Sequence, residues 1–163
     1  MKGNIKLISG TRIRSPLTNQ TRPTTSVVRE AIINILGKDL QGTSWLDLCS
    51  GSGAMGCEAL QKGIKRILAI EKQRTTAHIC KLNLIDVSSK NSYPVHVEVI
   101  CKDVISFLKD GPKNKIIKFF HQFPSLEQKF DFIFLDPPYH SKIYESTQEL
   151  LLKKKWIKKT STL

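Results

Sequence analysis

Apolar residues follow two periods along this chain, and the two periods alternate. Short apolar runs of strand length, bounded by glycine, proline or charged residues, are followed by stretches with apolar residues every three or four positions. Runs of the first kind are typical of buried strands, and stretches of the second kind are typical of amphipathic helices. The pattern predicts strands at 44–48, 66–70, 95–100 and 132–135, and helices at 26–36, 54–61, 75–84, 104–108 and 144–152. This alternation indicates an α/β fold with a doubly wound, mostly parallel sheet and right-handed crossovers.

The N-terminal residues do not follow this alternation of strands and helices. Residues 5–13 alternate loosely around Gly10, which predicts a small β-hairpin. We therefore divide the chain into a basic N-terminal hairpin and arm, residues 1–24, and one domain over residues 25–163. A domain of this length can bury one hydrophobic core without disulfides or metal ions.

The predicted strand at 132–135 runs directly into Asp136, two prolines and Tyr139. Prolines end a strand and fix the backbone that follows it. We expect the Asp136 carboxylate, the Pro137 carbonyl and the Tyr139 ring to converge on one planar, amine-bearing group, such as the exocyclic NH2 of a base. The alternative is a turn that only ends the strand, with Tyr139 as a packing residue.

A glycine-rich loop separates the strand at 44–48 from the next helix. Gly51, Gly53 and Gly56 satisfy the G-x-G-x-x-G pattern of dinucleotide sites, and Glu71 follows at about the spacing of the acid in that pattern. Asp47 stands four residues before Gly51. A carboxylate there would repel phosphates but attract the ammonium group of a cofactor that carries an amino acid.

Acidic residues end or follow each predicted strand. They are Asp47, Glu71, Asp103 and Asp136. Ligands of doubly wound sheets bind at the carboxyl ends of the strands, so we expect one ligand site at this edge. Two alternatives remain open: Glu71 as an exposed acid at a strand end, and Asp103 as the N-cap of the following helix.

Basic residues concentrate at the two ends of the chain. The net charge is +12, of which residues 1–42 carry +5 and residues 142–163 carry +4, leaving +3 for the residues between them. This distribution favours a polyanionic partner such as RNA. The alternative is a charge excess that serves only solubility.

The four cysteines lie in separate apolar segments without a Cys-x-x-Cys pair: Cys49, Cys57, Cys80 and Cys101. This arrangement indicates reduced thiols in a cytoplasmic protein, with a zinc site or disulfides as the alternative. No apolar run is long enough to span a membrane, and the N-terminus lacks the apolar stretch of a signal peptide. We expect no membrane partner and no metal ion.

These motifs together resemble the S-adenosylmethionine-dependent methyltransferases that modify an exocyclic amine, and most closely the RsmD type, the bacterial small-subunit ribosomal RNA guanine-N2 methyltransferases. That family has a basic hairpin and an Arg-Pro-Thr element before its first long helix. Residues 9–14 and 22–24 stand in those places, and residues 28–30 continue the match. The resemblance implies a Rossmann-like methyltransferase fold, S-adenosyl-L-methionine as cofactor, and transfer of a methyl group to a guanine N2. The implied partner is ribosomal RNA or an assembling small ribosomal subunit.

The resemblance also implies roles for individual residues. Those implied to bind the cofactor are Asp47, Gly51, Gly53, Glu71, Asp103 and Val104. Within this group Asp47 would lie near the ammonium, Glu71 near the ribose hydroxyls, and Asp103 near the adenine amine. Those implied to hold and stack on the target base are Asp136, Pro137 and Tyr139. The strongly basic segment before the strand at 44–48 contains Arg12, Arg14, Arg22 and Arg29, and its charge predicts contacts with RNA phosphates from at least the first three.

The chain departs from the family pattern in two places. Residues 111–129 form a longer connection than the family usually has, and we expect a short helix within it. The family continues with further strands where this chain ends, so we expect C-terminal strands to be missing and the strand at 132–135 to have an uncovered edge. An uncovered edge would lower stability or promote pairing with another chain.

Other functions remain open at this point. One is a DNA methyltransferase that acts on the amino group of adenine or cytosine, although the Arg-Pro-Thr element and the small size speak against it. Another is a truncated, non-catalytic RNA-binding relative. An NAD-dependent oxidoreductase is the weakest alternative, because Asp47 and the residues 136–139 have no role in it.

Overall fold

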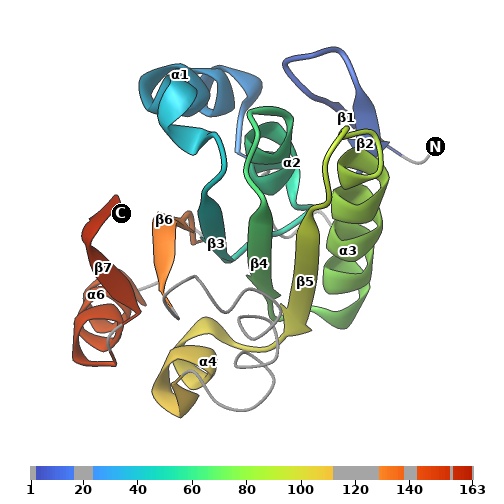
Figure 1. The fold of residues 1–163 in the computed structure, drawn as a ribbon. Helices are drawn as coiled ribbons and strands as arrows, with labels where there is room; N and C mark the ends of the chain where they lie inside the picture. Colours follow the sequence, from blue (N-terminus) through green and yellow to red (C-terminus); the bar gives the residue numbers. More distant parts are fainter. Residues whose placement is uncertain (1–2, 17–23, 112–128, 138–142, 155, 163) are drawn as a thin grey trace.

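A five-stranded parallel sheet forms the centre of the molecule, with strand order β5-β4-β3-β6-β7 (Figure 1). The computed structural model describes residues 3–16, 24–111, 129–137, 143–154 and 156–162. The five strands are β3 (Ser44–Leu48), β4 (Arg66–Glu71), β5 (His96–Cys101), β6 (Phe130–Leu135) and β7 (Ile157–Thr162). The predicted α/β sheet is confirmed.

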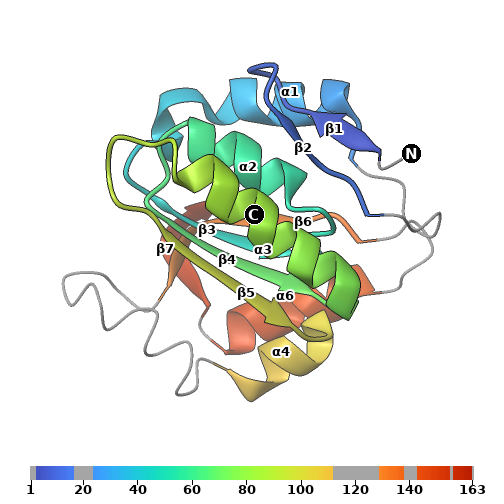
Figure 2. The ribbon, with the colours of Figure 1, turned by 90° about the vertical axis from the view of Figure 1, so that its right-hand side faces the viewer.

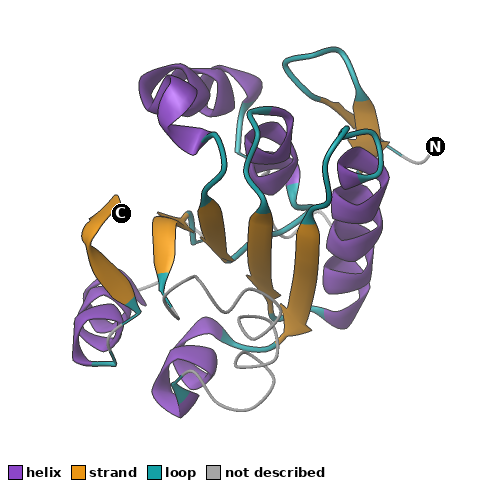
Figure 3. Ribbon diagram, viewed as in Figure 1, coloured by secondary structure: helices purple, strands orange, loops and turns teal. Residues whose placement is uncertain are grey.

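Helices cover both faces of this sheet (Figures 1 and 3). The helices are α1 (Ser26–Leu36), the 3-10 helix η1 (Gly37–Leu40), α2 (Ala54–Gln61), α3 (Arg74–Ser88), α4 (Val104–Asp110) and α6 (Ile143–Lys153). In Figure 2 α1, α2 and α3 lie on one side of the sheet, and α4 and α6 lie on the other. Among the described helices none has both the length and the apolar character needed to cross a bilayer.

Two apolar clusters, one on each face, hold the layers together. Because successive strand residues point to opposite faces, Trp45 and Phe132 pack under α1, α2 and α3, whereas Leu46 and Ile133 pack under α4 and α6. The ring centroids of Trp45 and Phe132 are 6.1 Å apart. The central strands are therefore buried on both faces, as their continuous apolar sequence predicts.

The predicted uncovered edge of β6 is wrong, because β7 pairs with β6 in parallel. The register joins Phe130 to Ile157 and Phe132 to Thr162, with an irregularity between the two pairs. Residues 157–162 read Ile-Lys-Lys-Thr-Ser-Thr, so only one of them is apolar. Edge strands are commonly polar and lysine-rich, and a search for apolar runs overlooks them.

The N-terminal hairpin consists of β1 (Asn4–Lys6) and β2 (Arg12–Arg14), paired antiparallel. It lies across α2 and α3 in Figure 2. Leu7 and Ile13 are 2% and 5% exposed and belong to the same apolar cluster as Leu60 and Leu84. The hairpin therefore shares the core of the domain. The helix expected within residues 111–129 falls almost entirely outside the described residues.

Candidate active site

The carboxyl ends of β3, β4, β5 and β6 lie side by side because the strands are parallel and adjacent. Asp47 pairs in register with Ala69 on one side and Phe134 on the other, which places it in the middle of the sheet. The carboxylates of Asp136 and Glu71 are close enough to raise the pKa of Asp47. The structure thus brings together acids that are far apart in the sequence.

The glycine loop after β3 has a backbone that side chains disfavour. Cys49, Gly51 and Gly53 have φ angles of 64°, 52° and 77°, in the left-handed region that glycine adopts most easily. A Cβ on Gly53 would lie 2.8 Å from Cys80 Sγ, whereas a Cβ on Gly51 would meet no heavy atom within 4 Å. Gly53 is needed for packing, and Gly51 leaves open space at the carboxyl edge for a ligand.

Glu71 holds this loop in place. Its Oε2 accepts a hydrogen bond from the Gly51 N–H at 3.0 Å, and its Oε1 accepts one from the Gln73 N–H at 2.8 Å. Glu71 is 9% exposed, so the alternative of an exposed acid at the strand end is wrong. Each carboxylate oxygen can accept a second hydrogen bond, which keeps a ligand hydroxyl compatible with these contacts.

Asp47 is a buried acid without a hydrogen-bond partner for either carboxylate oxygen within the described part of the chain. Only 1% of its surface is exposed. Burial raises the pKa of Asp47 to about 8, and the negative charges of Asp136 and Glu71 add to this effect; the nearby Gly56 backbone N–H acts in the opposite direction without reaching hydrogen-bond geometry. An unpartnered carboxyl group in such a place is suited to a cationic ligand group.

Asp103 caps the next helix along the edge. Its Oδ1 accepts a hydrogen bond from the Ser106 N–H at 3.0 Å, at the start of α4. The N-cap interpretation is therefore confirmed. A contact with the cofactor's adenine amine through Oδ2 remains a prediction. Val104 next to it is buried in the apolar cluster under α4.

Asp136 follows β6 and is exposed at the same edge. Its Oδ2 accepts a hydrogen bond of 2.5 Å from the hydroxyl of Thr24, a residue 112 positions earlier. Pro137 is buried, and Tyr139 lies outside the described residues. The Thr24 contact was not predicted, although the Arg-Pro-Thr element at 22–24 marked this segment as unusual.

Comparison with known proteins identifies the family. Residues 5–163 match the family described as Conserved hypothetical protein 95. Ribosomal RNA small subunit methyltransferase D of Buchnera aphidicola (from Acyrthosiphon pisum) is 32% identical over 161 residues, which cover 99% of this chain and 73% of that protein. The protein of the same name from Haemophilus influenzae is 32% identical over 161 residues, which cover 96% of this chain and 75% of that protein. The chain belongs to this methyltransferase D family.

Solved structures share the fold of this chain. A putative methyltransferase from Escherichia coli superimposes with a TM-score of 0.71 at 25% identity, covering 96% of this chain and 76% of that one. A SAM-dependent methyltransferase from Agrobacterium tumefaciens shares the fold, with a TM-score of 0.64 at 14% identity, and covers 98% of this chain and 50% of that one. The Rossmann-like methyltransferase fold is therefore confirmed.

The arginines expected to contact RNA lie in different environments in this family member. Arg12 is exposed on β2, and Arg14 forms a 2.5 Å ion pair with the exposed Asp86. Arg22 lies outside the described residues. Arg29 is only 3% exposed, so its predicted contact with RNA phosphates is wrong. It occupies the inward face of α1 one turn before the buried Ile33, and the positive charge alone did not reveal this.

The four cysteines are all free. Burial raises the pKa of Cys80 to about 12, so this thiol is protonated at neutral pH. Burial and nearby carboxylates raise the pKa of Cys49 to about 12 as well. Neither thiol is therefore prepared to act as a nucleophile. In the described ranges no group of three or more His, Cys, Asp or Glu side chains is placed to hold a metal ion.

Proposed function

We propose that this protein transfers a methyl group from S-adenosyl-L-methionine to the exocyclic N2 amine of a guanine in small-subunit ribosomal RNA. The observation that carries the proposal is the juxtaposition of the unpartnered Asp47 carboxyl, the open space beside Gly51 and the exposed Asp136 at one sheet edge. The names of the relatives support the reaction and the class of RNA. The substrate would be ribosomal RNA or an assembling small subunit in the cytoplasm.

The residues at this edge fit the proposed cofactor. Asp47 would pair with its ammonium group, and the Gly51 backbone would pass against its methionine part. Glu71 and Asp103, each with accepting capacity left, would bind the ribose hydroxyls and the adenine amine, with Val104 beside the ring. When bound, S-adenosyl-L-methionine supplies a methyl group that the positive sulfur already activates.

Positioning is the main task left to the protein, because the guanine amine is a weak nucleophile. The Asp136 carboxylate and the Pro137 carbonyl would accept hydrogen bonds from the two N2 hydrogens, which orients the nitrogen lone pair toward the methyl group. The Tyr139 ring would stack on the base after the base leaves its own stack. As the methyl group passes from sulfur to nitrogen, with the S–C bond broken and the N–C bond formed, the N2 atom would lose one proton, which the Asp136 carboxylate would receive.

The RNA side of the proposal rests on charge. Arg12, Arg14 and Arg22 would contact backbone phosphates close to the target nucleotide. Arg14 is able to do so because its partner Asp86 is half exposed, and such surface pairs contribute little to stability.

A methyl-transfer assay tests this function. Purified protein is incubated with methyl-labelled S-adenosyl-L-methionine and either small-subunit ribosomal RNA or small subunits from a strain that lacks the modification. We expect label in N2-methylguanosine after nuclease digestion. Label only in adenine, only in DNA, or in no nucleic acid at all would contradict the proposal.

The variant Asp136→Ala tests the site. It should lower the single-turnover rate by about 10²- to 10³-fold, the usual effect of removing one preorganised polar contact from a reaction centre. Cofactor affinity should change little. The exposed Asp39 in η1 offers a matched control, and Asp39→Ala should keep the wild-type rate. An equal loss of cofactor binding and turnover in Asp136→Ala would instead place Asp136 in the cofactor site.

A further inference from the structure

A buried ion pair lies between the hairpin and the candidate active site. Arg29 and Glu58 are 3% and 2% exposed, and Arg29 Nε donates to Glu58 Oε1 at 3.2 Å. Removing such a pair from water is costly unless additional hydrogen bonds satisfy it. Here Arg29 Nη1 donates to the Thr24 carbonyl at 2.7 Å, Arg29 Nη2 donates to the Lys6 carbonyl at 2.8 Å, and the Ile8 N–H donates to Glu58.

These contacts join the hairpin to the edge of the sheet formed by the carboxyl ends of the strands, which we call the catalytic edge because the candidate active site lies there. Lys6 and Ile8 belong to the hairpin, and Thr24 is the residue whose hydroxyl donates to Asp136. One arginine side chain therefore fixes the backbone on both sides of the segment 7–23 and sets where the Thr24 hydroxyl lies. A guanidinium group suits this task because its donors point in fixed directions.

A second buried residue connects the same hairpin to the glycine loop. Asn83 is fully buried, and its Nδ2 donates to the carbonyls of Arg14 and Ser52 at 2.9 Å each, while its Oδ1 accepts from the Arg14 N–H at 2.9 Å. Arg29 thus holds the hairpin next to Thr24, and Asn83 holds it next to the glycine loop. In Figure 2 it lies over α2 and α3, the helices that carry Glu58 and Asn83.

We propose that Arg29 and Glu58 are positioning residues: they hold Thr24 so that its hydroxyl orients the Asp136 carboxylate, and they couple this carboxylate to the RNA-facing hairpin. The effect on methyl transfer rests on the proposed function. The coupling between hairpin and Thr24 is independent of it. RNA that binds the hairpin arginines then contacts a segment rigidly connected to the reacting carboxylate.

Two neighbouring threonines make the first test specific. Thr24→Val removes the hydroxyl that contacts Asp136, and we expect kcat to fall roughly 10- to 100-fold with unchanged KM for RNA and unchanged melting temperature. Thr24→Ser should restore most of kcat. Thr25→Val is the matched control, because the Thr25 hydroxyl accepts from the Val28 N–H as the N-cap of α1; it should lower the melting temperature but leave kcat near wild type.

Equal kcat in Thr24→Val and wild type would overturn the orienting role. An equal loss of kcat in Thr24→Val and Thr25→Val would also overturn it, because the effect would then be structural.

The second test needs no enzymatic activity. Arg29→Lys keeps the charge but replaces the planar fork with a single ammonium group, which cannot reach both carbonyls and Glu58 together. We expect amide hydrogens of residues 4–14 to exchange at least about tenfold faster in this variant, while those of β4 exchange as in wild type. Unchanged exchange in the hairpin would overturn the coupling, even if the substrate proves to be another nucleic acid.

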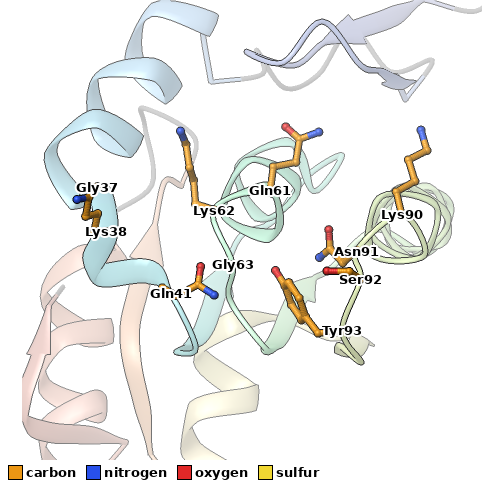
Figure 4. Close-up of a pocket in the computed structure, with 10 residues that line it drawn as sticks. All are labelled: Gly37, Lys38, Gln41, Gln61, Lys62, Gly63, Lys90, Asn91, Ser92 and Tyr93. Atoms are coloured by element: carbon orange, nitrogen blue, oxygen red, sulfur yellow. The ribbon is translucent and has the colours of Figure 1, made fainter.

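A separate observation concerns a cavity of about 760 Å³ at the opposite edge of the sheet (Figure 4). Three lysines from three elements line it: Lys38 in η1, Lys62 at the end of α2, and Lys90 after α3. We call these residues the lysine basin. No acidic residue lines the cavity, and Figure 4 shows Lys62 and Lys90 extending toward the side on which the hairpin lies.

The lysine basin continues toward the hairpin arginines. Lys90 also lines a smaller cavity of about 260 Å³, together with Arg12 and Arg14. Across the described residues none of the three basin lysines forms an ion pair. Unpaired lysines gathered in a hollow favour a ligand with several negative charges.

We infer that the lysine basin binds backbone phosphates of the RNA substrate at a distance from the target nucleotide, an inference that rests on the RNA substrate of the proposed function. Strands of five or six residues separate the basin from the catalytic edge, which corresponds to roughly 17–20 Å. An RNA that occupies both places must extend beyond the target nucleotide and its nearest neighbours.

Charge neutralisation tests the lysine basin with a matched control. The basin variant carries Lys38→Gln, Lys62→Gln and Lys90→Gln. The control is a second triple variant, with Lys109→Gln, Lys153→Gln and Lys154→Gln, which removes the same number of charges from exposed lysines of α4 and the end of α6. Affinity for a small-subunit RNA fragment is measured by fluorescence anisotropy at several salt concentrations. We expect the basin variant alone to lower the slope of log Kd against log salt by about two units, with unchanged kcat at saturating RNA. Equal slopes in the two triple variants would overturn the inference.

Discussion

Asp47 has a pKa that the fold determines. Burial and two nearby carboxylates raise it from 3.8 to about 8 in the folded protein. Between these two pH values the unfolded chain releases the Asp47 proton and the folded protein retains it. The unfolded state then binds fewer protons, so the contribution of Asp47 to the free energy of unfolding falls as pH rises from about 4 to about 8 and is constant above that.

Asp47→Asn should remove this contribution. The free energy of unfolding, measured with urea at several pH values, should decline less with pH in the variant than in wild type. The difference between the two proteins should grow up to about pH 8 and then level off. Parallel curves from pH 4 to pH 9 would show that Asp47 ionises in the folded protein as readily as in the unfolded chain.

The same carboxyl group links cofactor binding to protons. At pH 7 Asp47 is mostly protonated in the free protein, and a cofactor ammonium beside it would favour the ionised form. We expect cofactor binding to release about one proton at pH 7, measured by calorimetry in two buffers with different ionisation enthalpies. Asp47→Asn should release much less. Equal proton release in both proteins would place the ammonium away from Asp47.

The two glycines of the loop after β3 are required for different reasons. Gly51 and Gly53 both have left-handed φ angles, but of the two only Gly53 has no room for a side chain, because an added Cβ would lie 2.8 Å from Cys80 Sγ. The sequence predicts both glycines as a ligand loop. Only the packing of α3 against the loop reveals that Gly53 is held by sterics and that Gly51 faces open space.

Alanine at the two positions should therefore have different effects. Gly51→Ala should lower the free energy of unfolding by only about 1–2 kcal/mol, the cost of the left-handed conformation, and should weaken cofactor binding because its Cβ enters the open space. Gly53→Ala should lower stability more, because a clash is added to that cost. Thermal unfolding and cofactor titration of both variants check this; a larger stability loss for Gly51→Ala would contradict the packing described above.

At the element scale the regular helices and central strands were predictable. Residues 26–36 and 44–48 form a helix and a strand with the predicted bounds, because the apolar period is strong and a glycine ends the helix. α3 runs from Arg74 to Ser88, beyond the predicted 75–84. Val87 continues the helical period of Cys80 and Leu84 and is buried in the core, but the polar residues Asp86 and Ser88 on either side of it concealed this continuation. β7 was missed because backbone pairing with β6 defines it and its composition is polar.

At the scale of the whole molecule, β7 extends the sheet beyond β6. Its pairing leaves β6 with neighbours on both sides, β3 and β7. Trp156, directly before β7, is fully buried and its ring centroid lies 5.1 Å from that of Phe107 in α4. The residue that directly precedes the C-terminal strand therefore belongs to the core under α4 and α6.

Removing β7 should expose the edge of β6. A chain that ends at Trp156 should melt about 4–8 °C lower than wild type, which corresponds to about 2 kcal/mol for a domain of this size, and should associate with increasing concentration. A chain that ends at Thr162 serves as the control. Calorimetry and sedimentation measure the two effects, and unchanged melting with a monomeric shortened chain would show that β7 contributes nothing to stability.

The sequence by itself determined the sheet class, the order of the central elements and the edge at which the acidic residues meet. These features depend on apolar periods, which are local properties of the sequence, and on the general rule that parallel strands bring their carboxyl ends together. Asp47, Glu71, Asp103 and Asp136 were therefore found from residue order alone.

Tertiary structure alone decided which polar groups face inward and which contact one another. The charge of Arg29 predicted an RNA contact, but the position of Arg29 on the inner face of α1 gives it Glu58, Thr24 and Lys6 as partners. The hydrogen bond from Thr24 to Asp136 spans 112 positions, and no periodicity encodes a contact at that separation. Long-range polar pairing depends on how the layers pack, so it appears only when the whole chain is folded.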